Sequence, residues 1–366
     1  MLFEPARALR YSPEVEHEEA GEEKVAEELC KTMHGINETT YKHGGHAIRS
    51  VHAKSHALLE GELEVDGDLA PALAQGLFAK PGRYPVVLRF STIPGDILDD
   101  SVSTPRGCAI KVIGVAGERV PGTEGDATQD FVLVNGPAFS APNAKVFLGN
   151  LKLLAATTDK MEGVKKAASA FLRGVEGALE SVGVESSTLK TLGGQPETHI
   201  LGDSFYSQVP VRWGDHIAKV GLFPASPELR ALTDAPLNVN GKPDGLREAA
   251  NAFFAANGGV WDIRVQLCTN LHDMPVENAH KEWDEDKSPY LSVGRITVKP
   301  QTAWSEARSR AVDDGLSFTP WHALAAHRPL GSVMRARKRA YEMSTRFRAE
   351  HNGVSITEPR EAVRLP

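Results

Sequence analysis

From Ile48 onward the chain contains short runs in which apolar and polar residues alternate. This is the period of a strand that buries one face. Turn residues separate the runs, for example Lys80-Pro81-Gly82. The predicted strands span residues 57–65, 84–91, 108–115, 130–134, 206–213, 216–223, 261–268 and 291–298. Four lie before a long helical stretch and four after it, which predicts an antiparallel sheet or barrel.

Helical patterns flank and interrupt these strands. Residues 335–348 contain no Gly or Pro and are rich in Arg, Ala, Lys, Glu and Met, so they predict a helix. Residues 144–179 and 245–257 are also helical in character, and residues 14–28 predict one exposed helix. We therefore expect an α+β protein with an N-terminal arm (1–44), one large domain (45–350) and a C-terminal tail (351–366).

Charge and composition exclude several classes of function. The 366 residues carry a net charge of −7, so bulk attraction to nucleic acid or to an anionic membrane is not expected. The three cysteines are far apart and form no CxxC pair, which argues against a disulfide framework or a thiolate zinc site. No apolar run reaches the roughly 18 residues of a membrane helix, and the N-terminus lacks a signal-peptide pattern. We expect a cytoplasmic protein.

The predicted C-terminal helix carries candidate chemistry. Arg337, Tyr341, Thr345 and Arg348 are spaced by four, four and three residues and therefore share one face. A neighbouring cation favours the ionised form of a phenol, and an axial Tyr is one way to hold haem iron. Arg348 would then face an anionic group on the same ligand. The alternative is a solvated basic helix in which Tyr341 fills an amphipathic position.

Three other stretches stand out, and each has a structural alternative. His52 follows Arg49 by three residues and precedes a strand, where a His is often structural. Arg89 lies inside the apolar strand 84–91 and needs a partner if it is buried, or else reaches water at the strand end. Asn135 begins an Asn-Gly-Pro sequence, which is first of all a turn signal.

Taken together and in order, these stretches resemble the haem catalase superfamily. Its members carry an Arg, two further residues and then a distal His. They also carry an Arg-Phe-Ser-Thr strand, a Pro-Arg-Gly turn, an Asn-x-Pro-x-Phe turn and a proximal helix with Arg, Tyr and Arg. The matching positions are Arg49 and His52, Arg89 to Thr92, Pro105 to Gly107, Asn135 to Phe139, and Arg337, Tyr341 and Arg348. The segment Phe318-Thr319-Pro320-Trp321-His322 is similar to the short catalase-related peroxidases.

The resemblance implies a catalase-like eight-stranded antiparallel β-barrel with helical excursions and a C-terminal proximal haem helix. It implies haem b as cofactor, with Tyr341 as the ligand of the iron. His52 and Asn135 would be catalytic: His52 transfers the peroxide proton and Asn135 hydrogen-bonds the peroxide. The residues that would bind the cofactor or shape its pocket are Arg49, Val51, Arg89, Ser91, Phe139, Arg337 and Arg348.

The sequence also departs from full-length catalases. Only Asn135 is present where many catalases have two adjacent Asn, and Ser207-Gln208 stands where they back the proximal Arg with a His. The helical domain that follows the haem ligand in those proteins is missing, as is most of their N-terminal arm. We therefore expect a more accessible haem, and either a monomer or a homodimer.

These features imply a haem peroxidase that reduces hydrogen peroxide or organic hydroperoxides with small organic electron donors, with weak catalase activity. One alternative is rearrangement of fatty-acid hydroperoxides, as in the allene oxide synthases of the superfamily. Those enzymes carry Thr before the distal His, whereas this chain has Val51. The other alternative is a non-enzymatic haem-binding or haem-storage protein.

Overall fold

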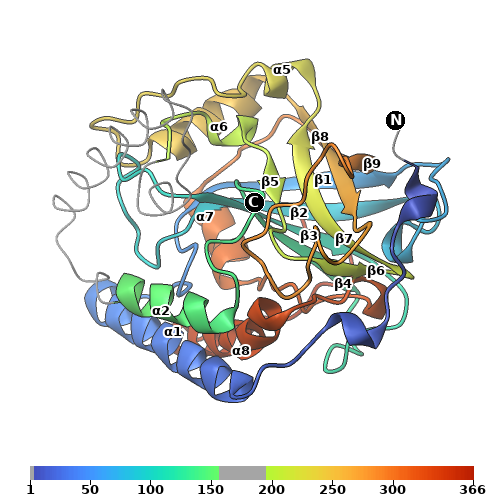
Figure 1. Ribbon diagram of the computed structural model, residues 1–366. Coiled ribbons are helices and arrows are strands. Elements are labelled where there is room, and N and C mark those ends of the chain that lie inside the picture. The colour runs from blue at the N-terminus through green and yellow to red at the C-terminus, as the bar shows by residue number, and fades with distance from the viewer. Residues whose placement is uncertain (1–3, 156–194) are drawn as a thin grey trace, which may run out of the picture.

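A closed antiparallel β-barrel forms the centre of the molecule in a computed structural model that describes residues 4–155 and 195–366 (Figure 1). Neighbouring strands follow the order β5-β4-β3-β2-β1-β9-β8-β7, and pairing of β5 with β7 closes the ring of eight, while β6 adds to β7. The predicted α+β fold with an eight-stranded barrel is confirmed. The strands are β1 (Ser55–Val65), β2 (Gly82–Thr92), β3 (Arg106–Ile113), β4 (Thr128–Val134), β5 (Phe205–Tyr206), β6 (Val211–Trp213), β7 (His216–Pro224), β8 (Gly259–Leu267) and β9 (Leu291–Val298).

The barrel strands bury their apolar positions in one large core. Phe90 on β2, Phe205 on β5 and Trp261 on β8 are fully buried and contact one another, with ring centroids 5.6 and 5.8 Å from Phe90. Aromatic side chains of this size supply much of the apolar area that stabilises a barrel of this diameter. The alternation in the sequence therefore located the barrel interior.

Three helices form a layer on one side of the barrel: α1 (Glu22–Gly44), α2 (Ala144–Ala155) and α8 (Ser332–Asn352) (Figure 1). Leu29 and Met33 of α1 pack in one buried cluster with Ala340 and Phe347 of α8. Smaller helices are α5 (Pro227–Arg230), α6 (Gly245–Ala256) and α7 (Glu306–Ser309), and a π-helical turn covers Arg310–Asp314. The proximal-helix prediction thus corresponds to α8, which lies beneath the barrel and against α1.

Some predicted elements differ from the structure. The helix expected over residues 14–28 instead begins at Glu22, after Gly21 at φ 84°, and runs on to Gly44. The strand expected over 206–213 is broken into β5 and β6, because Gln208 adopts φ 61° and Pro210 follows it. The helix expected over 144–179 is seen as α2 up to Ala155, and its continuation lies outside the described residues.

The C-terminal tail runs back along the outside of the barrel. Its Glu358 and Leu365 are nearly buried, and the Pro366 carbonyl accepts a hydrogen bond from Nε of Arg308 at 2.9 Å.

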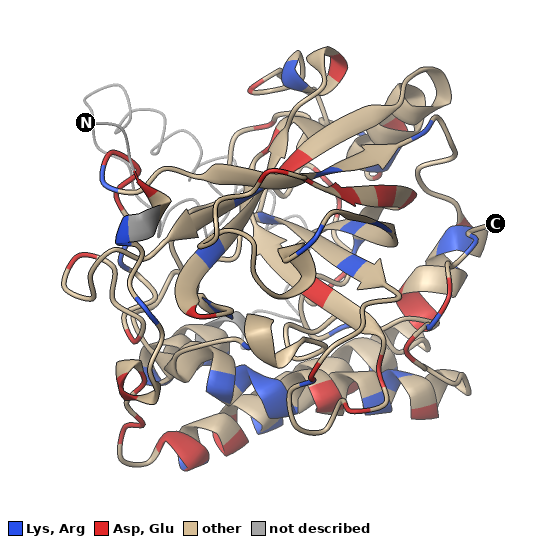
Figure 2. Cartoon of the chain, turned by 90° about the vertical axis from the view of Figure 1, so that its right-hand side faces the viewer, with Lys and Arg blue, Asp and Glu red and all other residues tan. Residues whose placement is uncertain are grey.

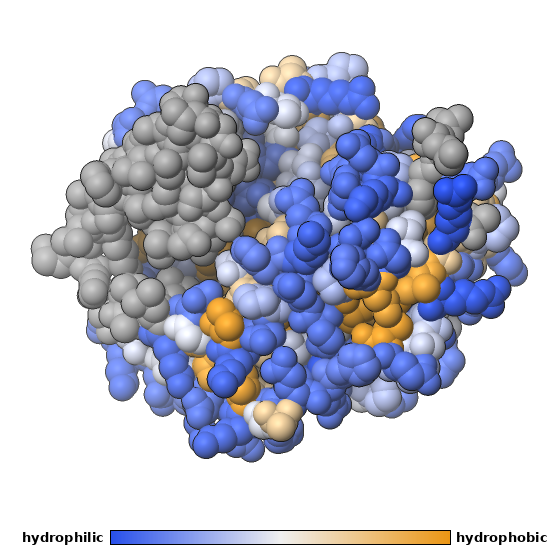
Figure 3. All heavy atoms as spheres, viewed as in Figure 1, coloured by the Kyte–Doolittle hydropathy of each residue, from blue (hydrophilic) through white to orange (hydrophobic). Residues whose placement is uncertain are grey.

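Acidic and basic residues are interspersed over the molecule (Figure 2). The face shown in Figure 3 is mainly hydrophilic, with small separate apolar patches. No helix within 4–155 and 195–366 is long and apolar enough to cross a membrane.

Candidate active site

A cavity lies between α8 and the segment 49–51 that precedes β1. The helix contributes Tyr341 and Arg348 to its wall, and the segment contributes Arg49 and Val51. The remaining lining residues come from α1, the same segment 49–51, the loop after the π-helical turn and α8: Met33, Ser50, Phe318, Ala340, Ser344 and Thr345. The volume is about 60 Å³, roughly the share of two water molecules in liquid water.

The phenol of Tyr341 faces a cation on its own helix. Arg337 precedes it by one turn, and the guanidinium Nη2 donates a short hydrogen bond to the phenol oxygen. Nη1 of Arg337 contacts the sulfur of Met334 at 3.6 Å. Residues four apart share a helix face, so the pairing follows from the sequence spacing. The arrangement places a cationic donor directly against the phenol oxygen.

Three guanidinium groups converge on Asp313 beside the cavity, two on its carboxylate and one on its backbone carbonyl; we call Arg49, Arg89, Arg348 and Asp313 the arginine cluster. The Asp313 Oδ1 atom accepts from Nε of Arg89 at 2.7 Å and from Nη1 of Arg49 at 3.1 Å. Arg348 donates to the Asp313 backbone carbonyl, and Arg49 also donates to the Leu316 carbonyl at 3.0 Å. The π-helical turn Arg310–Asp314 thus brings Asp313 to cations from three different parts of the chain.

Positive charge is in excess in this cluster. Burial, Arg348 and Arg89 all lower the pKa of Arg49, and burial and Arg89 lower the pKa of Arg348 to about 10. The second acid nearby, Asp314, is already paired with His46 at 2.9 Å. Nε of Arg348 is buried and has no hydrogen-bond partner. Buried donors are normally satisfied, so this orphaned nitrogen indicates a place for an anionic ligand.

His52 lies just before β1 in a strained backbone conformation. Its φ is 54°, a region that L residues rarely adopt. The ring Nδ1 is 3.1 Å from Oγ of Ser91, and a Cβ on Gly107 would come within 2.6 Å of the ring. Burial, followed by Arg89 and Arg337, lowers the pKa of His52 to about 3. The imidazole is therefore neutral at ordinary pH, and the absence of a side chain at 107 gives it room.

Asn135 and Phe139 occupy the turn after β4. The Oδ1 of Asn135 accepts from the Arg106 amide at 2.8 Å, and Nδ2 donates to Asp203 at 3.1 Å. Phe139 packs edge-on to Phe147, with ring centroids 4.9 Å apart. Both polar atoms of Asn135 are thus bound to protein groups, and its assignment as the distal amide stays a prediction.

Solved catalase structures share this arrangement of elements. A fungal catalase superposes with a TM-score of 0.60 at 20% identity, over 86% of this chain and 63% of that one. Catalase A from Saccharomyces cerevisiae gives 0.57 at 19% identity over 85% and 63%, and a bacterial catalase gives 0.58 at 18% over 89% and 62%. The chain has the fold of the catalase superfamily. It spans less than two thirds of the length of these catalases.

No protein-family model and no curated protein matches the chain. The likeness to catalases therefore rests on the fold, at identities of 18–20%.

Within the catalase fold, the predicted residues divide into two groups. Four line the cavity: Arg49, Val51, Tyr341 and Arg348. The others are not part of its wall. Arg89 and Arg337 are connected to it through Asp313 and Tyr341. His52, Ser91, Asn135 and Phe139 make contacts of their own: His52 with Ser91 and beside Gly107, Asn135 with Arg106, and Phe139 with Phe147. Sequence reasoning missed Asp313, since no local pattern distinguishes it from other acids. It noted Gly107 only as part of the Pro105–Gly107 turn and not as the residue that gives the His52 ring its room.

The chemistry of the side chains fits a haem, whereas the cavity volume does not. A phenol with an adjacent guanidinium matches an iron ligand, and the arginine cluster with its orphaned Nε matches propionate groups. The volume of about 60 Å³ is too small for a macrocycle, so α8 and residues 49–51 would have to move apart. In the sequence, Ser207-Gln208 stands in place of a His behind Arg337. In the structure, the Gln208 amide donates to the carbonyls of Gly136 and Ala138 at 3.1 and 2.7 Å.

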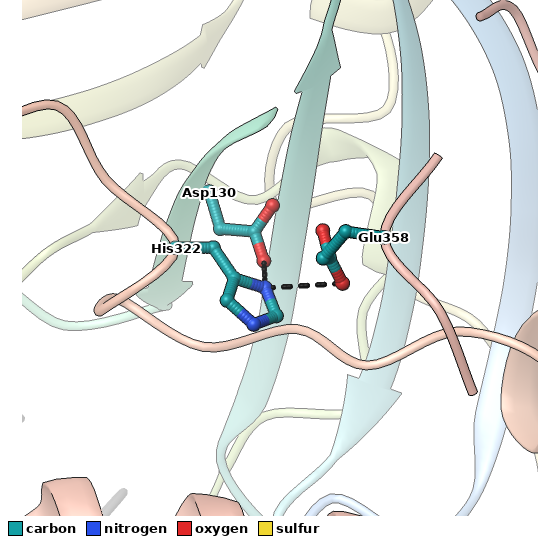
Figure 4. Close-up of side chains that lie close together, drawn as sticks. All are labelled: Asp130, His322 and Glu358. Atoms are coloured by element: carbon teal, nitrogen blue, oxygen red, sulfur yellow. Dashed lines mark hydrogen bonds and ion pairs between the residues drawn. The ribbon is translucent and has the colours of Figure 1, made fainter. Parts of the chain in front are cut away.

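A second group of titratable residues lies on the outside of the barrel (Figure 4). Asp130 and Glu358 are each within 3.2 Å of Nδ1 of His322, a set of side chains that metal sites often use. However, the ammonium of Lys111 lies 2.8 Å from Asp130 and 2.5 Å from Glu358. We call these four residues the lysine cluster. Its cation is already supplied by the protein, so it does not need a metal.

Proposed function

We propose that the protein is a haem peroxidase that reduces hydrogen peroxide or organic hydroperoxides with organic electron donors. The observation that carries the proposal is the cavity wall that combines Tyr341 with the cation-rich arginine cluster. A planar dianionic cofactor with a metal suited to a phenolate satisfies both features at once. Haem bound there would supply the redox chemistry with peroxide, and the chain would supply binding and proton transfer.

Each binding residue then has a defined task. Tyr341 would hold the iron through its phenol oxygen, to which Arg337 donates a hydrogen bond. Arg49 and Arg348 would bind the propionates. Arg89 contributes a further positive charge, and it donates hydrogen bonds to the His52 carbonyl at 2.8 Å and to the Asp313 carboxylate. Val51 on the opposite wall keeps the pocket apolar. The residues of α8 and those before β1 therefore hold opposite sides of one ligand.

His52 acts as the proton carrier. Since its Nδ1 faces the hydroxyl of Ser91, Nε2 is the ring nitrogen left to accept a proton from one oxygen of a bound peroxide. When His52 returns that proton to the other oxygen, the second oxygen leaves as water instead of hydroxide. The low pKa of His52, about 3, keeps the base free at ordinary pH. Asn135 would turn from Asp203 to hydrogen-bond the peroxide, and Phe139 would help exclude water.

An absorption spectrum of the purified protein mixed with haem tests the proposal. We expect a high-spin ferric spectrum that changes on addition of peroxide and returns faster with an organic donor. Tyr341→Phe should lose the haem spectrum. The control is Tyr290→Phe, which removes the hydroxyl of a tyrosine outside the cavity wall, and it should keep the spectrum; that hydroxyl is buried and has no hydrogen-bond partner. His52→Ala should bind haem but lose the response to peroxide. A protein that takes up no haem would refute the proposal, and an unaffected His52→Ala variant would indicate haem storage instead.

A further inference from the structure

Trp321 lies at the surface beside the helix that carries Tyr341. It is only partly buried, and it precedes the His322 drawn in Figure 4. Its indole Nε1 donates to the Met334 carbonyl in the first turn of α8 at 3.2 Å. The ammonium of Lys338 lies 5.1 Å from the ring centroid. An oxidisable aromatic ring that is only partly buried is thus fixed to the helix.

A continuous path of contacts joins this ring to Tyr341. Met334, which accepts the indole hydrogen bond, is almost fully buried, and its sulfur contacts Nη1 of Arg337. The other terminal nitrogen of Arg337 donates to the phenol oxygen of Tyr341. Met334 and Tyr341 are seven residues apart on one helix, about 10 Å along its axis. Such a path, made of hydrogen bonds and one helix, is short enough for electron transfer within a protein.

The cavity itself offers little room for a donor. Its free volume is about 60 Å³, and Met33 and Phe318 form part of the wall. The cofactor itself would take up this space, so bulky donors need a site outside the cavity. Trp321 is partly exposed and is not part of the cavity wall, and the adjacent Lys338 attracts negatively charged molecules.

We propose that Trp321 is a surface oxidation site at which bulky, electron-rich, anionic aromatic donors are oxidised one electron at a time. The inference rests on the proposed peroxidase function, because peroxide is the oxidant that drives it. Small donors react in the cavity, and bulky donors react at Trp321. The chain therefore has two donor sites that share one oxidising centre.

The electron balance of the step is simple. One electron leaves the indole of Trp321 toward the oxidised centre, and the donor at the surface replaces it, so that two donor molecules are consumed per peroxide. No bond forms or breaks at Trp321, and Nε1 keeps its proton because the Met334 carbonyl is not a base. The positive charge of Lys338 makes the indole harder to oxidise but a stronger oxidant once the electron has left.

The test compares Trp321→Phe with Trp304→Phe in the haem-loaded protein. Trp304 is a matched control, since it is also partly exposed and also has a cation, Arg247, over its ring at 3.9 Å. The dye ABTS serves as the bulky anionic donor and methanol as the small one. We expect Trp321→Phe to lower ABTS oxidation by about tenfold or more and to leave methanol oxidation unchanged, while Trp304→Phe alters neither.

Two readouts do not depend on turnover. Peroxide added without a donor should leave oxidised indole at position 321, and not at 304, in peptide mass spectra. In the haem-free protein, ABTS should quench part of the tryptophan fluorescence. This quenching should be absent in Trp321→Phe. Lys338→Met should raise the KM for ABTS, because the charge that attracts the anionic dye is lost. It should not lower kcat, because the Trp321 indole is easier to oxidise without the neighbouring cation.

Failure of the inference is distinguishable from failure of the proposed function. If the protein binds haem and oxidises methanol, but Trp321→Phe oxidises ABTS at the wild-type rate, the surface site is refuted and the peroxidase stands. If no haem is bound, both proposals are refuted together. Equal loss of methanol and ABTS oxidation in Trp321→Phe would also refute the site, since it would show a general effect on α8.

Discussion

The arginine cluster and the lysine cluster are both buried, yet they differ in how completely they satisfy their own charges. In the lysine cluster, the Lys111 ammonium bonds to both carboxylates, and Asp130 also receives the Thr319 amide at 3.0 Å. In the arginine cluster, three guanidinium groups share Asp313, and Nε of Arg348 has no partner. A saturated cluster stabilises the fold, whereas an unsaturated one is prepared for a ligand.

The pKa directions support the same distinction. Burial alone would raise the pKa of Asp130, but Lys111 and His322 outweigh it and the pKa is lowered. For Arg49, burial and the neighbouring cations act in the same direction, and the charged form is disfavoured. Each member of the lysine cluster is stabilised by its partners, whereas the arginines repel one another until an anion arrives.

The largest expected effect comes from removing the cation of the lysine cluster. Lys111→Met leaves two buried carboxylates without their ammonium, and breaking a buried ion pair typically costs about 3–5 kcal/mol. We expect the free energy of unfolding to fall by that amount in urea titrations. Adding Asp130→Asn to the variant should restore part of the loss. A change below about 1 kcal/mol, as for surface ion pairs, would contradict the view that this cluster stabilises the fold.

Removing a cation from the arginine cluster should have the opposite effect on the fold. Arg348→Met eliminates a repelled, partly unsatisfied guanidinium, so the haem-free protein should unfold at the same or a higher urea concentration. Haem binding should weaken by about 1.5–3 kcal/mol, because a charge-assisted hydrogen bond to the ligand is lost. The exposed Arg346→Met on the same helix is the control and should change neither quantity. Marked destabilisation of haem-free Arg348→Met would show that this arginine is a structural residue.

Acid should weaken the arginine cluster through Asp313. Burial would raise the pKa of this carboxyl, but Arg89 and Arg49 lower it from 3.8 to about 2. A depressed native pKa contributes stability that is present above pH 3.8 and is lost as the pH falls toward 2; here it amounts to roughly 2 kcal/mol. The difference in unfolding free energy between wild type and Asp313→Asn should therefore shrink by that amount between pH 5 and 2. A constant difference would mean that Asp313 is not held ionised by the arginines.

Much of the fold could be predicted from the sequence because the strands alternate with a clear period. The limits of β9 match residues 291–298, and α8 includes the whole predicted helix 335–348. The N-terminal helix was misplaced because the acidic residues 14–21 have helical propensity but no tertiary partner that requires a helix. Residues 29–44 are helical because Leu29 and Met33 pack against α8, and such packing outweighs local propensity.

The candidate site was only partly predictable, for a similar reason. Arg337 and Tyr341 are four apart on one helix, so their contact follows from the spacing. Asp313 binds Arg49 and Arg89, which are more than 200 positions away, and no local pattern encodes that meeting. The break at Gln208 depends on a positive φ that the sequence did not indicate, because Gln is not a residue that favours it.

The smallest expected effect is the response of the lysine cluster to metal. The ammonium of Lys111 occupies the space between the carboxylates, so Zn²⁺ would have to displace it. This would leave a buried lysine without partners, which is unfavourable in free energy. The melting temperature of the wild-type protein should therefore be the same with Zn²⁺ as with a chelator. In Lys111→Met, the freed oxygens of Asp130 and Glu358 with the His322 nitrogen form a plausible zinc site, and Zn²⁺ should raise the melting temperature. A Zn²⁺-dependent rise in the wild type that His322→Ala abolishes would show that this cluster is also a binding site, and the contrast between the two clusters would then no longer hold.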